Sequence, residues 1–218
     1  MIIAAANIND IEIDLTHISN ERLERVDKLH FEEDRKRSLC AEFLLNHILH
    51  MMDESIRFPL NLGILKDGKP YLPDYPQYHF NLSHSGAYAV CAVDLLPVGV
   101  DIEVIRPISD QIARRFFTRK EYLDIHKCSE SEEGRLDLFY QYWVLKESFM
   151  KTLGLGMQLP MDSFEILMQE DMISYCQSIT NGQYFGKIFN EIEGYKIGVC
   201  SEHKDIKETE LVMVTSGK

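Results

Sequence analysis

The chain has 218 residues, with 23 basic and 35 acidic side chains and a formal net charge of −12 at pH 7. Its 45% hydrophobic and 27% charged residues are ordinary for a globular protein and exclude a disordered or fibrous one. The acidic charge argues against binding nucleic acid through a general basic surface, and no run of about 20 apolar residues predicts a membrane helix. The short apolar start, Met1–Asn7, lacks the basic lead of a signal peptide and predicts a first β-strand.

In the N-terminal half, Ser19–Leu49 has apolar side chains at spacings of three and four, which predicts helix. Lys66–Pro70 predicts a turn, because Asp-Gly supplies a positive φ and proline prevents a helix. Aromatic, β-branched and small residues then predict two strands, Tyr78–Leu82 and Tyr88–Val93, on either side of a loop at Ser83–Gly86.

The C-terminal half begins with a predicted strand at Val98–Val104, followed by short helices at Gln111–Phe117 and from Thr118. A long helix, Leu136–Leu153, is predicted to end at Gly154, and the alternating pattern beyond Phe164 predicts several antiparallel strands. The overall pattern of helices and antiparallel strands is that of an α+β fold. A weak sign of duplication is the likeness of Tyr88–Val93 to Tyr195–Cys200.

The five cysteines are scattered and lack the paired spacing of a zinc site. We expect them to be reduced, half-buried thiols of a cytoplasmic protein. They are Cys40, Cys91, Cys128, Cys176 and Cys200.

Two carboxylates, Asp101 and Glu103, stand two residues apart in the strand Val98–Val104 and therefore project from the same face. Two negative charges held so close repel each other unless a cation lies between them, and oxygen ligands suit magnesium. The structural alternative is an exposed acidic strand face.

Glu147 and Lys151 are four residues apart in the long helix, so they share one side of it. By itself this spacing is typical of a surface ion pair. The functional alternative requires Glu147 to meet the strand carboxylates and Lys151 to meet a phosphate.

The loop Ser83–Gly86 offers hydroxyls, an imidazole and backbone N–H groups that are able to cradle a phosphate. A plain turn is the alternative, and a nucleophilic serine is disfavoured because no G-x-S-x-G elbow is present. Basic residues that precede these motifs are balanced by nearby acids, yet single arginines are able to clamp a phosphate. Taken together, the cradle, the carboxylate pair and the helical Glu/Lys pair indicate phosphoryl transfer from a diphosphate ester.

In this combination the sequence resembles the 4′-phosphopantetheinyl transferases of the broad-specificity type, which activate peptide synthetases such as surfactin synthetase. Five motifs carry the resemblance, in family order and with family spacing. They are Asp67–Pro70, Phe80–Gly86, Gly99–Glu103, Arg115–Phe117 and Trp143–Lys151.

The resemblance implies a pseudo-dimer of two similar halves, residues 1–100 and 101–218, each with a small antiparallel sheet packed on helices. Coenzyme A would lie in the cleft between the halves as co-substrate. The implied Mg²⁺ ligands are Asp101, Glu103 and Glu147. The implied contacts to coenzyme A come from Arg22, Arg25, Arg37, Ser38, Lys69, Ser83, His84 and Lys151.

The resemblance also implies the reaction. A serine hydroxyl of an apo acyl or peptidyl carrier protein attacks the β-phosphorus of coenzyme A, and 3′,5′-ADP leaves. The base is Glu147, a water held by the metal beside it, or Glu121, and Lys151 stabilises the leaving phosphate. A coenzyme A-binding or carrier-binding protein without turnover is the alternative, while another nucleotide phosphotransferase lacks the G-x-x-x-x-G-K-[ST] loop.

The chain length, about double that of one half-unit, favours a monomer over the short trimeric type. The expected partners are carrier proteins of pathways such as nonribosomal peptide and antibiotic biosynthesis, with no nucleic acid and no membrane. Because such carriers are commonly acidic, we expect docking near Ile108–Leu123, where four basic residues gather. These are Arg114, Arg115, Arg119 and Lys120.

Overall fold

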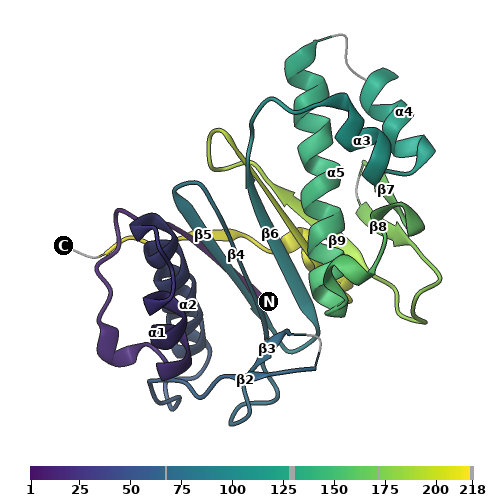
Figure 1. The fold of residues 1–218 in the computed structure, drawn as a ribbon. Helices are drawn as coiled ribbons and strands as arrows, with labels where there is room; N and C mark the ends of the chain where they lie inside the picture. Colours follow the sequence, from purple (N-terminus) through teal and green to yellow (C-terminus); the bar gives the residue numbers. More distant parts are fainter. Residues whose placement is uncertain (67, 128–130, 171, 217–218) are drawn as a thin grey trace.

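A computed structural model describes residues 1–66, 68–127, 131–170 and 172–216 of the chain. It contains two main sheets, each covered by helices, that lie side by side with β6 (Val98–Val104) near the middle (Figure 1). Among the described residues, no helix is long and apolar enough to cross a membrane.

The first sheet has the strand order β11-β1-β5-β4. β1 (Ile2–Asn7) pairs antiparallel with β5 (Tyr88–Asp94), which pairs antiparallel with β4 (His79–Ser85). The prediction that the strands after Phe164 are all antiparallel is wrong for one strand, because β11 (Leu211–Met213) pairs parallel with β1. The end of the chain therefore returns to the first sheet.

α2 (Glu32–Met52) covers one face of the first sheet and buries an apolar core there, and α1 (Asn20–Asp27) packs against α2. The sequence predicted one helical segment at this place. The structure divides it because α1 ends at its C-cap residue Lys28 and the backbone is extended at Phe31, directly before the first turn of α2. A small hairpin, β2 (Gly63–Ile64) and β3 (Pro70–Tyr71), follows, and the predicted turn connects its strands, with Asp67 outside the described residues.

The second sheet has the strand order β6-β10-β9-β8-β7, and all its pairs are antiparallel. Its strands after β6 are β7 (Glu165–Gln169), β8 (Met172–Cys176), β9 (Phe185–Phe189) and β10 (Tyr195–Ser201). Its helices are α3 (Asp110–Phe116), α4 (Arg119–Lys127) and α5 (Glu132–Leu153). Short 3-10 helices lie at Leu15–His17, Gly156–Gln158, Met161–Ser163 and Lys204–Glu208.

α5 begins four residues before its predicted start, because the Ser131 hydroxyl accepts the N–H of Gly134 and caps it. It ends as predicted at Gly154, whose φ of +72° suits glycine. The helix lies directly on β6 and β10 at two glycines. A Cβ on Gly99 would lie 2.0 Å from the carbonyl oxygen of Ser148, and one on Gly198 would meet the backbone of Val144 at 2.8 Å.

The two halves share an arrangement, because the orders β1-β5-β4 and β6-β10-β9 are both antiparallel. Tyr88 and Tyr195 begin the equivalent strands β5 and β10, and their ring centroids lie 4.9 Å apart, edge to face. A further apolar core joins the halves and includes Ile3, Val90 and Val199. The predicted α+β pseudo-dimer is thus confirmed, while the division into residues 1–100 and 101–218 stays a prediction.

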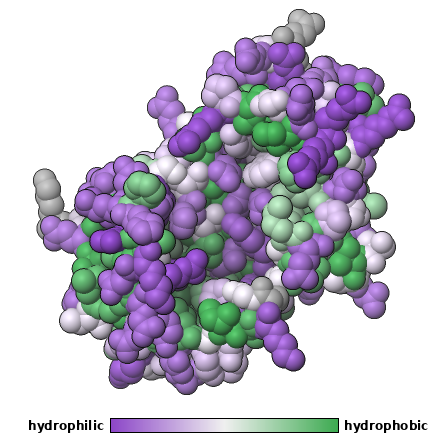
Figure 2. Space-filling view, in the orientation of Figure 1, coloured by the Kyte–Doolittle hydropathy of each residue, from purple (hydrophilic) through white to green (hydrophobic). Residues whose placement is uncertain are grey.

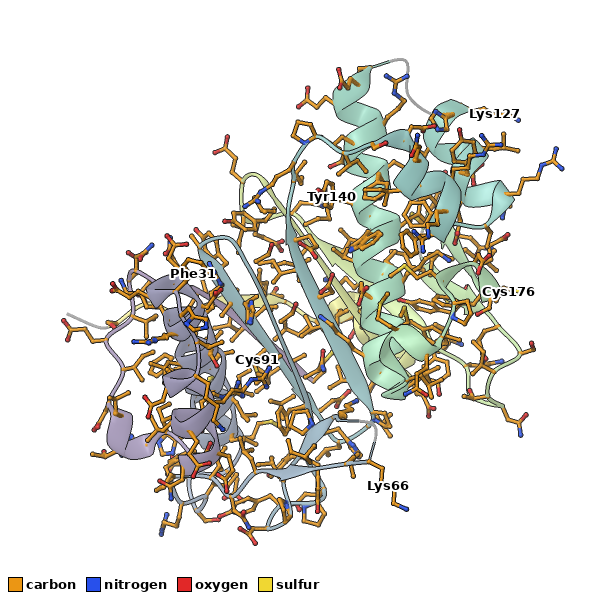
Figure 3. All side chains as sticks on the ribbon, in the orientation of Figure 1. Phe31, Lys66, Cys91, Lys127, Tyr140 and Cys176 are labelled. Carbon is orange, nitrogen blue, oxygen red and sulfur yellow. The ribbon has the colours of Figure 1, made fainter. Side chains whose placement is uncertain are left out.

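The cysteines described are free: Cys40, Cys91 and Cys200 are buried, whereas Cys176 is exposed. Figure 3 shows Cys91 inside the first half and Cys176 at the outer edge of the second. Burial raises the pKa of the Cys40 and Cys200 thiols to about 12, so these groups are poor nucleophiles at neutral pH. Cys128 lies outside the described residues.

Candidate active site

The segment predicted as a phosphate-cradling loop is mostly strand. Ser83, His84 and Ser85 belong to β4 and pair with β5, so only Gly86 and Ala87 form the turn. Gly86 has a φ of +55°, which glycine allows without strain. Because neighbouring residues of a strand face opposite sides, Ser83 is buried while His84 is exposed.

The Asp101 carboxylate is the centre of a buried polar cluster between β4, β6 and α5. Its Oδ1 accepts hydrogen bonds from Lys151 Nζ at 2.6 Å and from Ser83 Oγ at 2.9 Å. Lys151 Nζ also donates to Ser83 Oγ at 3.0 Å and to the carbonyl oxygen of Val100 at 3.3 Å. Asp101 is only 4% exposed, and its buried Oδ2 has no hydrogen-bond partner. One buried carboxylate oxygen of Asp101 therefore lacks a donor.

Two further carboxylates lie within electrostatic reach of Asp101. The pKa of Glu103 is raised, chiefly by burial and then by the Asp101 charge. The pKa of Glu147 is raised by the same two causes in the same order, with Lys151 opposing the shift. The site is therefore short of positive charge, and the helical pair does not form the simple surface contact, because Lys151 pairs with Asp101.

The donor set of this cluster fits a hard divalent cation in its chemistry. Asp101, Glu103 and Glu147 supply carboxylate oxygens, and the unpartnered Asp101 Oδ2 is a buried acceptor without a donor. Within the described residues, no three His, Cys, Asp or Glu side chains are already gathered as a metal ion would hold them. The Lys151 ammonium lies against Asp101 here and supplies the local positive charge.

Arg37 and His84 come together at the turn between β4 and β5. Arg37 Nη1 donates to the carbonyl oxygen of Gly86 at 2.8 Å, and its guanidinium also pairs with Asp34. The pKa of His84 is lowered, first because the surrounding protein limits hydration of the ring and then because of the Arg37 charge. These two side chains offer N–H donors beside the cluster.

Other predicted coenzyme A contacts make internal bonds in the structure. Arg22 forms an ion pair with the buried Glu42 at 2.9 Å and donates to Ser38 Oγ at 3.2 Å, which joins α1 to α2. Arg25 is exposed on α1. Lys69 Nζ donates to the carbonyl oxygens of Lys151, Thr152 and Val98 at 2.8, 3.2 and 3.5 Å, so it holds the end of α5 against β6.

Glu121 is not brought to the Asp101 cluster. It is 1% exposed, pairs with the fully buried Lys146 at 3.0 Å, and accepts the N–H groups of Thr118 and Ile166, both at 2.9 Å. Lys146 also donates to the carbonyl oxygens of Met161 and Phe164. Sequence reasoning missed this pair, since 25 residues separate its members and no local spacing relates them.

The face drawn in Figure 2 is hollowed between the two halves, and hydrophilic residues line the hollow. The sequence also matches protein-family models and known proteins. Residues 97–200 match the model of the 4′-phosphopantetheinyl transferase superfamily, and residues 6–95 match the model "4′-phosphopantetheinyl transferase, N-terminal". The 4′-phosphopantetheinyl transferase Sfp of Bacillus subtilis (strain 168) is 35% identical over 92% of this chain and 89% of its own length.

The chain belongs to the 4′-phosphopantetheinyl transferase superfamily. The 4′-phosphopantetheinyl transferase gsp of Aneurinibacillus migulanus is 34% identical over 85% of this chain and 77% of its own. A crystal structure of holo-[acyl-carrier-protein] synthase from Thermotoga maritima matches 48% of this chain and 61% of its own with 17% identity and a TM-score of 0.41, which is a distant likeness. The broad-specificity type that the sequence motifs resemble is confirmed by the Sfp relative.

Proposed function

We propose that this protein transfers the 4′-phosphopantetheine group of coenzyme A to a serine of an apo peptidyl or acyl carrier protein and releases 3′,5′-ADP. The transferase activity follows from family membership over nearly the whole chain. The structural observation that supports it most is the Asp101 cluster, in which the Asp101 carboxylate, the Lys151 ammonium and the Ser83 hydroxyl meet between the two halves. These are groups that position and stabilise a phosphoryl group during transfer.

Asp101, Glu103 and Glu147 are the residues that would hold Mg²⁺. When bound, the ion supplies positive charge that offsets the charge of the diphosphate. The unpartnered Asp101 Oδ2 and the raised pKa values of the two glutamates support this assignment, because each marks a place where positive charge is missing.

In the proposed reaction the serine oxygen of the carrier forms a bond to the β-phosphorus, and the bond from this phosphorus to the bridging oxygen breaks. The serine proton goes to a base, and Lys151 stabilises the negative charge on the leaving phosphate oxygen. Glu147 is the favoured base, because its carboxylate lies within electrostatic reach of Asp101 and Lys151 and is not held by a buried lysine as Glu121 is. Glu121 is less favoured, because its oxygens are already engaged by Lys146 and two backbone N–H groups.

Coenzyme A is proposed to lie in the cleft between the halves, with Arg37, Ser83, His84 and Lys151 nearest its phosphates. Arg22, Arg25, Ser38 and Lys69 are proposed as further contacts to its phosphates and nucleotide, and three of these side chains make internal bonds in the structure. A cytoplasmic monomer, divided at residues 100 and 101, completes the proposal.

Incubation of the protein with coenzyme A, Mg²⁺ and a panel of apo carrier proteins tests the function by intact-protein mass spectrometry. We expect carriers of nonribosomal peptide synthesis to gain the mass of phosphopantetheine, and the same carrier with its acceptor serine replaced by alanine to gain none. Coenzyme A binding without any mass gain across the panel would instead favour a binding protein without turnover.

A further inference from the structure

Two strands from different sheets, β4 and β6, lie beside each other in the middle of the molecule (Figure 1). Each is the edge strand of its own sheet. The backbone N–H groups of alternate β6 residues are accepted by side chains of alternate β4 residues, since every second residue of a strand faces one side. The bonds are Val100 N to Asn81 Oδ1 at 2.9 Å, Ile102 N to Ser83 Oγ at 3.3 Å and Val104 N to Ser85 Oγ at 3.1 Å.

Two of these three β4 side chains also hold a carboxylate. Ser83 Oγ donates to Asp101 at 2.9 Å, and Ser85 Oγ donates to Glu103 Oε2 at 3.0 Å. A serine hydroxyl has one proton, so an N–H bound to its lone pair leaves that proton free to point at the carboxylate. Asn81 differs, because its side-chain oxygen accepts the Val100 N–H and has no proton to donate to a carboxylate.

Glu103 depends on its serine more than Asp101 does. Asp101 accepts hydrogen bonds from both Lys151 and Ser83. Among the described residues, the Glu103 carboxylate accepts a hydrogen bond from Ser85 alone. A glutamate also has one more side-chain torsion to restrain than an aspartate, and this freedom carries an entropic cost when a ligand fixes it.

We propose that Ser85 is a positioning residue, which aims the Glu103 carboxylate at the divalent cation of the active site. The assignment rests on the proposed magnesium site. Residues that hydrogen-bond to metal ligands typically change metal affinity by about 10–100-fold when they are replaced. Ser85 therefore acts through Glu103 and does not itself touch the substrate.

The test is Mn²⁺ binding to the free full-length protein, followed by electron paramagnetic resonance, with thermal melts in parallel. We expect Ser85→Ala to weaken Mn²⁺ binding about tenfold. Ser85→Thr, which keeps the hydroxyl, should bind Mn²⁺ as the wild type does. Ser85→Val, which has the shape of threonine without the hydroxyl, should not. Asn81→Ala removes an equivalent bond between β4 and β6 and should lower the melting temperature without weakening Mn²⁺ binding.

Wild-type affinity in both Ser85→Ala and Ser85→Val would overturn the proposal, as would an equal loss in Asn81→Ala, which would assign the effect to the contact between the strands. If Ser85→Ala does not fold, the Thr and Val pair decides the matter by itself. Failure of the wild-type protein to bind Mn²⁺ or Mg²⁺ would overturn the metal site together with this role, whereas binding that is indifferent to Ser85 would overturn this role alone.

Discussion

At the scale of single residues, Glu147 has the clearest prediction, because it combines a raised pKa with two proposed roles. We expect Glu147→Gln to reduce transfer by about 100-fold or more, which is the usual contribution of a general base. High Mg²⁺ should partly restore an Asp101→Asn variant, which weakens a metal ligand and the ion pair with Lys151 but removes no proposed base, and it should not restore Glu147→Gln. The transfer rate is measured against Mg²⁺ concentration for both variants. Near wild-type turnover of Glu147→Gln at ordinary Mg²⁺ would contradict both roles.

The same variant should affect the metal-free protein in the opposite sense. A carboxyl whose pKa is raised on folding contributes stability below its unfolded pKa and loses it as the pH rises through the folded value. The charged Glu147 therefore weakens the fold at pH 7, and Glu147→Gln should unfold at a higher temperature than the wild type. The difference should shrink as the pH falls towards the ordinary glutamate pKa of about 4.3. Thermal melts in a chelator across this range give the comparison.

His84 is exposed on β4 beside Arg37, so its loss should affect binding more than folding. We expect His84→Ala to weaken coenzyme A binding by about 10–150-fold, the equivalent of one hydrogen bond to a charged group. Isothermal titration with coenzyme A and a thermal melt measure the two effects, and His50→Ala on the last turn of α2 is the control. A lower melting temperature with unchanged affinity would show that His84 stabilises only its own turn.

At the scale of elements, the position of α5 depends on glycines in the strands beneath it. A Cβ on Gly99 would meet the Ser148 carbonyl at 2.0 Å, and backbone is unable to move aside as a flexible side chain does. Gly99→Ala should therefore destabilise the protein by about 1–3 kcal/mol, and it should displace Glu147 and Lys151 from Asp101. Gly182→Ala is the matched control, because its nearest neighbour is the flexible Glu202 side chain. Denaturant melts that rank the two variants equally would contradict this account of the contact.

The buried pair of Glu121 and Lys146 joins α4 to α5. Lys146→Met would leave the Glu121 charge buried without its partner, so we expect a loss of about 3–5 kcal/mol in the free energy of unfolding. Adding Glu121→Gln should recover part of that loss, since the double variant has no buried charge at this place. A full double-mutant cycle in denaturant measures the coupling. If the Glu121→Gln variant stays folded but loses all transfer activity, Glu121 would instead be the base of the reaction.

Local sequence patterns predicted several elements well. The alternation from Val98 to Val104 defined β6, and the glycine after Leu153 defined the end of α5, because each signal comes from neighbouring residues. The Ser-His-Ser-Gly run was predicted as a loop, since nothing in it shows that the serines satisfy β6 backbone groups some 19 residues away. Local sequence patterns also do not predict the parallel pairing of β11 with β1, because this pairing joins residues from the two ends of the chain.

The candidate site shows the same limit. Asp101 and Glu103 were predicted from strand periodicity, and Glu147 and Lys151 from helix periodicity, while their meeting followed only from the resemblance to a family. Lys151 was expected at a phosphate, and the structure places it against Asp101. Ser85 and Lys146 were not singled out, because the first acts through Glu103 and the second is paired across a long sequence interval.

At the scale of the whole molecule, the chain has a net charge of −12, and the carrier proteins that we expect it to bind are expected to be acidic too. The general field opposes such an encounter, so a local basic surface has to offset it. Arg114, Arg115 and Arg119 are exposed on α3 and α4, whereas Lys120 is paired with Glu165 at 2.8 Å. The charge available to a carrier therefore comes mainly from the arginines.

We expect the double variant Arg114→Glu, Arg119→Glu to raise KM for the carrier about tenfold and to leave coenzyme A affinity unchanged, as two lost and reversed surface contacts would do. Lys204→Glu, Lys207→Glu is the matched control, because each replacement changes the charge by −2 and both pairs move the net charge from −12 to −16. Only the arginine pair should affect the carrier, and the effect should shrink as salt shortens the Debye length from about 10 Å at 0.1 M to about 3 Å at 1 M. Equal effects of both pairs would mean that net charge alone governs the encounter, and an unchanged KM for the arginine pair at low salt would place the carrier on another surface.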